Sequence, residues 1–174
     1  MKLSIILFAI FCLIGCSINN QPDNRFYTED GRFKVNFPIK PVVNNQILKS
    51  TFGNIIFTSC YSKKNEDEKY FASSSVYDYT VKNDEDKILL LEDSRNYILN
   101  QLEIDLISER DTIVNDYMGK FFKASADNYY VDILQLIENN RVFQVGIMKN
   151  DEQIIADDFN NLINSFEIIK PNNK

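Results

Sequence analysis

Residues 129–149 read YYVDILQLIENNRVFQVGIMK, and this stretch decides the fold. Two runs rich in Ile, Leu and Val flank Asn139-Asn140. Asparagine tolerates the left-handed conformations that a two-residue type I′ turn requires. The pattern therefore predicts a β-hairpin with strands at 129–138 and 141–149.

A two-residue turn also determines which residues face each other across this hairpin. The predicted pairs are Glu138–Arg141, Leu136–Phe143 and Leu134–Val145 on one face, and Ile137–Val142, Gln135–Gln144 and Ile133–Gly146 on the other. Both faces are largely apolar. Such a strand pair belongs in the middle of a sheet that is covered on both sides.

Gln135 and Gln144 are the polar exception in this hairpin. If they are buried, their amides need hydrogen-bond partners. One interpretation is a cross-strand amide hydrogen bond beneath a helix, and the other is a polar spot in a small binding pocket. We favour the first interpretation and keep both residues as candidate site residues.

The chain before this hairpin predicts more strands. A hairpin over 25–37 is expected to turn at Glu29-Asp30-Gly31, because an Asp-Gly step favours a tight turn. A second hairpin over 46–62 is expected to turn at Gly53. A further strand is expected over 69–80, where Tyr, Phe and Ser are frequent.

Helices and strands alternate in the remaining segments. Apolar residues at helical spacing predict a helix over about 84–105. Gly119 is expected to break the chain before a strand over 120–125. The other expected elements are a strand over 106–114, a capped helix that starts within 150–153, and a short extended segment over 165–169.

The order of these elements resembles the PsbP-like fold. Tyr27 to Pro38, Ile107 to Gly119 and Asp158 to Ile168 carry the resemblance. An extrinsic photosystem II subunit, a Ran-binding import factor and many bacterial envelope lipoproteins share this fold. The resemblance implies an α+β class, with a mainly antiparallel sheet between helices in an α/β/α sandwich. It implies no shared catalytic residues.

Tyrosines are concentrated in the predicted strand over 69–80. Tyr70, Tyr77 and Tyr79 lie there together with Phe71. Tyrosine is favoured at protein interfaces, so the segment is a candidate recognition surface. Packing of a half-buried strand explains the same composition, and we favour that explanation.

The N-terminus predicts an exported lipoprotein. Lys2 precedes an apolar run from Leu3 to Ile14, which is too short to span a bilayer as a helix. The ending Leu13-Ile14-Gly15-Cys16 resembles the lipobox of bacterial lipoproteins. That resemblance implies cleavage after Gly15 and lipid attachment, palmitate included, at Cys16.

The predicted signal divides the chain into three parts. Residues 1–15 are the signal peptide, 16–24 are the lipidated cysteine and a polar tether, and 25–170 are one globular domain. Eight tether residues reach at most about 28 Å, which keeps the domain near its membrane. Ser17 after the cysteine suits outer-membrane sorting with a periplasm-facing domain.

Composition excludes several kinds of chemistry. The sequence has no His, which removes Ser-His-Asp triads, Cys-His pairs and His zinc ligands. Its formal net charge is −6, so nucleic acid is a poor partner. Cys60 is the one mature thiol besides Cys16, and it is expected to be a small buried residue in a strand.

Carboxylates are the abundant reactive groups, in clusters at 84–86, 151–152 and 157–158. They suit Ca²⁺ binding or, as we favour, the starts and polar faces of helices. We expect no cofactor. The sequence thus favours a non-catalytic, lipid-anchored envelope protein that binds another protein. The alternative is a periplasmic protein that binds a small ligand or a cation.

The lipid anchor is testable by one substitution. Cys16→Ser removes the acceptor thiol, so the protein should leave the membrane fraction while its fold stays intact. An acidic domain has no electrostatic reason to stay at an anionic membrane without the lipid. Fractionation of cells followed by immunoblotting measures this, and a variant that stays membrane-bound would contradict the prediction.

Overall fold

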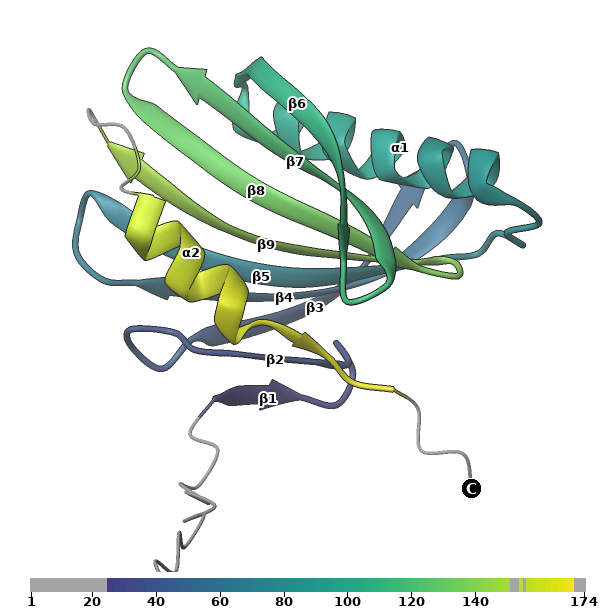
Figure 1. Ribbon diagram of the computed structural model, residues 1–174, viewed down its shortest axis with the longest axis horizontal. Helices are drawn as coiled ribbons and strands as arrows, with labels where there is room; N and C mark the ends of the chain where they lie inside the picture. The colour runs from purple at the N-terminus through teal and green to yellow at the C-terminus, as the bar shows by residue number, and fades with distance from the viewer. Residues whose placement is uncertain (1–24, 151–153, 155, 171–174) are drawn as a thin grey trace, which may run out of the picture.

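Two antiparallel sheets and two helices make up the fold (Figure 1). The structure is a computed structural model that describes residues 25–150, 154 and 156–170. The predicted signal peptide, Cys16 and tether therefore lie outside the described residues. Every described strand pair is antiparallel. The prediction of an α+β fold with a mainly antiparallel sheet is confirmed.

The larger sheet has seven strands in the order β3-β4-β5-β9-β8-β7-β6. Its strands are β3 (Val42–Ser50), β4 (Gly53–Lys63), β5 (Glu68–Tyr77), β6 (Asp105–Val114), β7 (Tyr117–Ala126), β8 (Tyr129–Glu138) and β9 (Arg141–Asn150). The predicted central hairpin is β8–β9. All six predicted cross-strand pairs are observed. The hairpin lies inside the sheet, with β5 and β7 as its neighbours.

The two faces of this sheet are covered differently (Figure 1). Helix α1 (Asp84–Leu102) lies behind the sheet in this view, and α2 (Ala156–Ser165) lies in front of it. A small sheet of β1 (Phe26–Thr28), β2 (Phe33–Val35) and β10 (Glu167–Ile168) shares the α2 side. The front is thus covered by strands as well as by a helix.

Each face of the central hairpin contributes to a separate core. On the α2 side, Leu134 and Phe143 pack with Phe159 of α2 and Phe33 of β2. On the α1 side, Ile137 and Val142 pack with Leu90 and Leu91, and Ile133 packs near the end of α1. The prediction that both faces of the hairpin are buried is confirmed.

Local sequence explains where α1 starts and ends. The side chain of Asn83 accepts a hydrogen bond from the Asp86 N–H at 2.9 Å, which caps the first turn. Acidic residues in that turn stabilise the helix, because their negative charges lie at the positive end of the helix dipole. Glu103 adopts φ 54°, and its N–H bonds to the Leu99 carbonyl, which ends the helix close to the predicted residue.

The predicted break at Gly119 is wrong. Residue 119 lies inside β7, and the turn before that strand is at Asn115 and Asp116, which both have positive φ. A Cβ at position 119 would lie 2.0 Å from the Gln135 carbonyl oxygen. Glycine is needed here because a neighbouring strand approaches closely, which local sequence does not reveal.

The first predicted hairpin forms, but its turn differs. Arg32, and not Gly31, has positive φ (57°), and the Arg32 N–H donates to the Thr28 carbonyl at 3.0 Å. A Cβ on Gly31 would lie 2.6 Å from both Thr28 and Phe33. The glycine therefore makes room for the aromatic ring of Phe33 and does not supply a left-handed conformation.

The C-terminal elements follow the predicted order with shifted limits. Strand β9 continues to Asn150, so the helix start predicted within 150–153 does not include that residue. Residues 151–153 lie outside the described part of the chain. The extended segment after α2 is confirmed as β10, and it pairs with β2.

Gly119→Ala tests the close approach of β7 and β8. The added methyl group has a backbone oxygen in its way, so we expect a loss of about 3 kcal/mol in the free energy of unfolding. Ser108→Ala at an exposed position on β6 is the control and should change it by less than about 0.5 kcal/mol. Urea unfolding monitored by circular dichroism measures both, and equal stabilities would contradict the prediction.

Candidate functional site

Gln144 is buried between the sheet and α1. Its Nε2 donates to Ser94 Oγ of α1 at 2.7 Å, and its Oε1 accepts from Ser73 Oγ of β5 at 3.1 Å. The side chain of Gln144 also reaches the bottom of a surface groove beside α1. It therefore takes part in a hydrogen-bond network and lines a pocket.

Gln135 is fully buried under the same helix. With its amide oxygen oriented toward the available donors, it accepts from Gln144 Nε2 at 2.7 Å and from the Arg95 N–H at 3.2 Å. Its amide nitrogen donates to the Leu91 carbonyl at 3.3 Å. This network links two central strands to one turn of α1. Gln135 does not line the groove that Gln144 reaches.

The three candidate tyrosines do not form one surface. Tyr70 is buried on the α2 side and donates to Glu68, whereas Tyr77 is buried on the α1 side and donates to Asp93 at 3.1 Å. Burial and these carboxylates raise the pKa of both phenols above its ordinary value. Tyr79 is half-buried and packs edge-on against an aromatic ring.

The α1 groove is the candidate site that the structure offers. We give this name to a hollow of about 320 Å³ between the C-terminal half of α1 and strands β4 and β5. It exists because α1 packs mainly on β7, β8 and β9 and leaves this part of the sheet less covered. Its apolar lining includes Phe57, Tyr61, Phe71, Ala72, Tyr97, Ile98, Leu102 and Met148.

Polar groups lie at the rim and floor of the α1 groove. They are Gln46, Ser59, Lys69, Ser73, Gln101 and Gln144. Cys60 of β4 also borders the groove, but it is fully buried and belongs to the core on the opposite face, where burial raises the pKa of its thiol to about 12. The expected burial of Cys60 in a strand is confirmed. The groove therefore offers apolar contact and neutral hydrogen bonds, with one cation.

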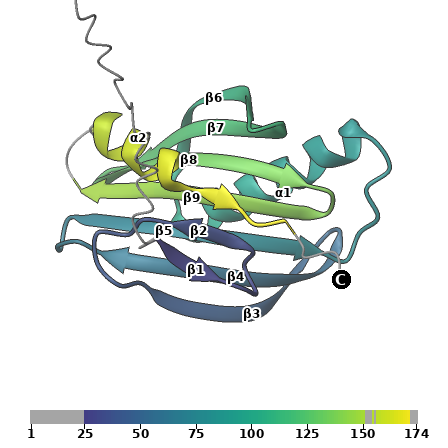
Figure 2. The ribbon, with the colours of Figure 1, turned by 60° about the horizontal axis from the view of Figure 1, so that its bottom comes forward.

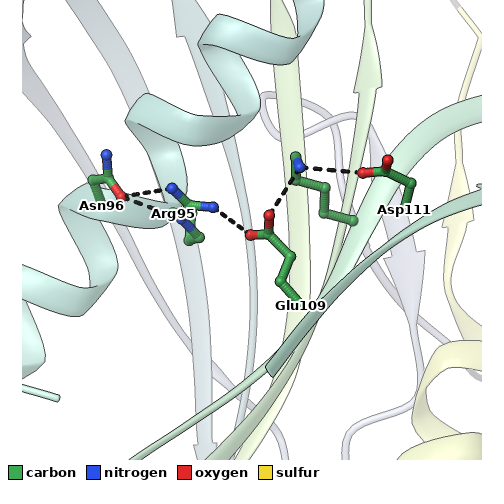
Figure 3. A network of polar contacts seen from close by, with 5 residues as sticks. Arg95, Asn96, Glu109 and Asp111 are labelled. Atoms are coloured by element: carbon green, nitrogen blue, oxygen red, sulfur yellow. Dashed lines mark hydrogen bonds and ion pairs between the residues drawn. The ribbon is translucent and has the colours of Figure 1, made fainter. Parts of the chain in front are cut away.

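A charged network ties α1 to the other edge of the sheet (Figure 3). Glu109 of β6 accepts from Arg95 of α1 at 2.5 Å and from Lys120 of β7 at 2.9 Å. Lys120 also contacts Asp111 at 3.1 Å. These charges border a second groove of about 540 Å³, which is lined by Ile88, Leu91, Asp111, Thr112, Ile113, Met118, Gly119 and Lys120.

The network shifts the pKa of its buried members. Burial alone would raise the pKa of Glu109, but the hydrogen bonds from Arg95 and Lys120 outweigh it and leave that pKa below its ordinary value. For Lys120, burial lowers the pKa, and the contacts with Glu109 and Asp111 outweigh this effect and raise it. Both side chains are thus held charged and paired.

Two kinds of geometry are missing from the part of the chain that the structure describes. No three His, Cys, Asp or Glu side chains in that part of the chain come together as a metal site. None of the described helices is long and apolar enough to cross a membrane. The charged cluster of Figure 3 is internally paired, so its groups are occupied with one another.

The sequence pointed to Gln144 and, within the tyrosine-rich segment, to Phe71, and it gave no indication of the other residues that line the groove. Tyr97 and Gln101 are four residues apart on α1, a spacing that places two side chains on one helix face. That spacing was a usable signal. No sequence pattern indicated the network of Arg95, Glu109 and Lys120, because three separate elements supply its members.

Comparisons with known proteins identify the fold. No known family model matches the sequence, and no curated protein sequence matches it. The structure is similar to the solution structure of cyanobacterial PsbP (CyanoP) from Synechocystis sp. PCC 6803, with a TM-score of 0.54 and 8% identity. The match covers 83% of this chain and 91% of that chain. The chain has a PsbP-like fold.

Glu109→Gln tests the charged network. Loss of the negative charge leaves two partly buried cations with a weaker partner, so the free energy of unfolding should fall by about 2 kcal/mol at pH 7. The pKa of Glu109 is lower in the folded protein than in the unfolded chain. The carboxylate therefore makes its full contribution to the free energy of unfolding above the unfolded pKa of about 4.3, and this contribution is lost as the pH falls through the folded pKa. The difference between wild type and variant should therefore shrink below about pH 4.

Asp111→Asn is the matched control, since Asp111 contacts the same lysine but its side chain is 88% exposed. We expect a change below about 0.5 kcal/mol. Chemical unfolding at several pH values measures both variants. A Glu109→Gln effect that does not vary with pH would contradict the assignment.

Proposed function

We propose that the protein is a non-catalytic accessory factor of the bacterial cell envelope, held by lipid at Cys16, that binds a protein through the α1 groove. Where an outer membrane is present, the domain faces the periplasm from it. The observation that carries the proposal is the open, aromatic-lined groove beside a helix. Aromatic side chains in a partly open hollow suit the anchor residues of a protein partner.

The distribution of charge indicates what kind of partner segment would bind. Helix α1 contains five carboxylates and two cations, Lys87 and Arg95. The carboxylates all precede the groove-lining residues of α1, and the charged residue in the groove lining is Lys69, so a basic group would act beside the groove and not inside it. The whole chain is also acidic. An approaching segment with an apolar side chain next to basic groups would gain from both features, because complementary charge speeds encounter and orients binding. We therefore propose a basic and apolar segment of another envelope protein as the occupant.

A second candidate function uses the same groove. Its volume of about 320 Å³ lies at the lower end of the range for small-molecule sites, and its lining is mostly apolar. This favours an apolar small ligand over a cation. Enhanced fluorescence of an apolar naphthylamine dye, lost in Tyr97→Lys, would support this alternative.

Site-specific photocrosslinking tests the leading proposal. A benzophenone amino acid replaces Gln101, which is exposed at the groove, in the full-length protein in cells. The matched control replaces Asp157, which is exposed on α2 at the opposite face. We expect a defined protein adduct from position 101 and not from 157.

A second variant makes the result specific to the groove. Tyr97→Lys places a cation where the basic segment would dock, and it should reduce the adduct at least about tenfold. Lys34→Glu on β2 lies on the other face and should leave it unchanged. Adducts that are equal at both crosslinking positions, or insensitive to Tyr97→Lys, would overturn the proposal.

A further inference from the structure

The seven-stranded sheet ends in two edge strands that differ in kind. Strand β6 is protected against pairing with another strand, because Glu109, Arg110 and Asp111 lie in its middle and its register with β7 shifts between Leu106 and Ser108. Charges and irregular register are usual devices against edge-to-edge association. Strand β3 has no register shift with β4, and its one charged residue, Lys49, lies next to its end.

Strand β3 is a regular edge that is uncharged over most of its length. Its nine residues pair with β4 without a register shift, and no charged residue occurs from Val42 to Leu48. Figure 2 shows β3 as the outermost strand at the bottom of the molecule. Val42 and Ile47 are 65% and 74% exposed, and Ile56 of β4, which pairs with Ile47, is 60% exposed. This edge thus presents apolar side chains on both of its faces.

A hydrogen bond at the start of β4 shows which backbone groups of β3 point outward. The Asp78 N–H donates to the Asn54 carbonyl at 2.9 Å, so Asn54 faces β5 and Gly53 faces β3. Along an antiparallel strand, the backbone N–H and C=O groups of successive residues point alternately to the two sides. Because Ser50 pairs with Gly53, the backbone groups of Ser50 and of every second residue before it point toward β4. The N–H and C=O groups of Val43, Asn45, Ile47 and Lys49 therefore point away from the sheet.

These outward residues are self-complementary in one antiparallel register. With Asn45 opposite Asn45 of a second copy, the cross-strand pairs become Val43–Ile47, Val42–Leu48 and Asn44–Gln46. Apolar side chains then meet apolar ones on both faces, and amides meet amides. A shift by two residues in either direction places Val43 opposite Lys49 or Asn45 and loses this match. Matched cross-strand pairs stabilise a sheet by about 0.2–1 kcal/mol each.

We propose that the protein forms a two-fold homodimer through antiparallel pairing of β3 with β3 of a second copy, centred on Asn45. The seven-stranded sheets of the two copies then become one continuous sheet. The Asn45 side chain donates to Asp30 at 3.3 Å, so the loop between β1 and β2 borders this edge. The exposure of Ile47 shows that this loop leaves the edge accessible.

The symmetry places the first described residues of both copies on one side. Antiparallel strands in one sheet are related by a two-fold axis perpendicular to the sheet, so each face of one copy continues as the same face of the other. Strands β1 and β2 of both copies therefore lie on the α2 side, as does Arg25, the first described residue. Two tethers starting there can reach one membrane. The α1 grooves lie together on the other face.

Disulfide crosslinking of the full-length protein in membranes tests this register. In a hydrogen-bonded antiparallel pair the two Cα atoms are about 5.5 Å apart, which a disulfide can span. Asn45→Cys should therefore give a covalent dimer on oxidation. Lys49→Cys is the control, because the two copies of residue 49 would be about 27 Å apart in this register. A Val43→Cys chain and an Ile47→Cys chain should form a disulfide with each other when they are co-expressed, and neither variant should form one alone.

A charge at the interface provides the second measurement. Ile47→Lys should weaken the dimer at least about tenfold, because two lysines would replace matched apolar pairs. Ile113→Lys is the control, since Ile113 is 76% exposed on the opposite edge strand β6. Light scattering of the purified wild type and variants gives the protein mass, and circular dichroism verifies that each variant is folded.

Each outcome decides the proposal. A dimer that links at position 45, not at 49, and dissociates with Ile47→Lys would support it. A monomeric wild type, equal crosslinking at 45 and 49, or a dimer insensitive to Ile47→Lys would overturn it. Ile47 lies on the face opposite the α1 groove, so adduct formation from position 101 reports on the proposed partner independently.

Discussion

The β8–β9 hairpin cannot leave either of its faces in water, and the arrangement of the other elements follows from this constraint. Its side chains are apolar on both sides, so one face needs α1 and the other needs α2 with the small sheet. At about 25 cal/mol per Å² of apolar surface, exposing either face would cost several kcal/mol. The layers on both faces thus cover the central hairpin, whose apolar pattern local sequence already defines.

Polar contacts then determine where α1 lies. Its fully buried residues are Leu90, Leu91 and Ser94, a short apolar contact for a helix of 19 residues. The amides of Gln135 and Gln144 and the ion pair of Arg95 with Glu109 act at defined atoms, whereas apolar packing alone would allow the helix to slide. Because the helix is held over β7 to β9, the surface over β4 and β5 is left for the groove.

The sequence predicted what depends on local pattern and missed what depends on distant neighbours. The central register followed from a two-residue turn and alternating side chains, and the start of α1 followed from apolar residues at helical spacing and the acidic cluster at 84–86. Gly119 was misassigned because its constraint is the backbone of β8, ten or more residues away. The groove likewise depends on where a helix crosses a sheet. Gln144 pointed to this region because a buried amide in an apolar strand needs hydrogen-bond partners.

Burial of Cys60 has a consequence for how the protein matures. A thiol with a pKa near 12 is almost entirely protonated at neutral pH, and the protonated form neither attacks disulfides nor binds metals readily. Cys60 is also the one cysteine in the described part of the chain. Once folded, this domain is therefore indifferent to the redox state of its compartment. It needs no oxidase or isomerase to reach its final covalent form, and reductants should leave its stability unchanged.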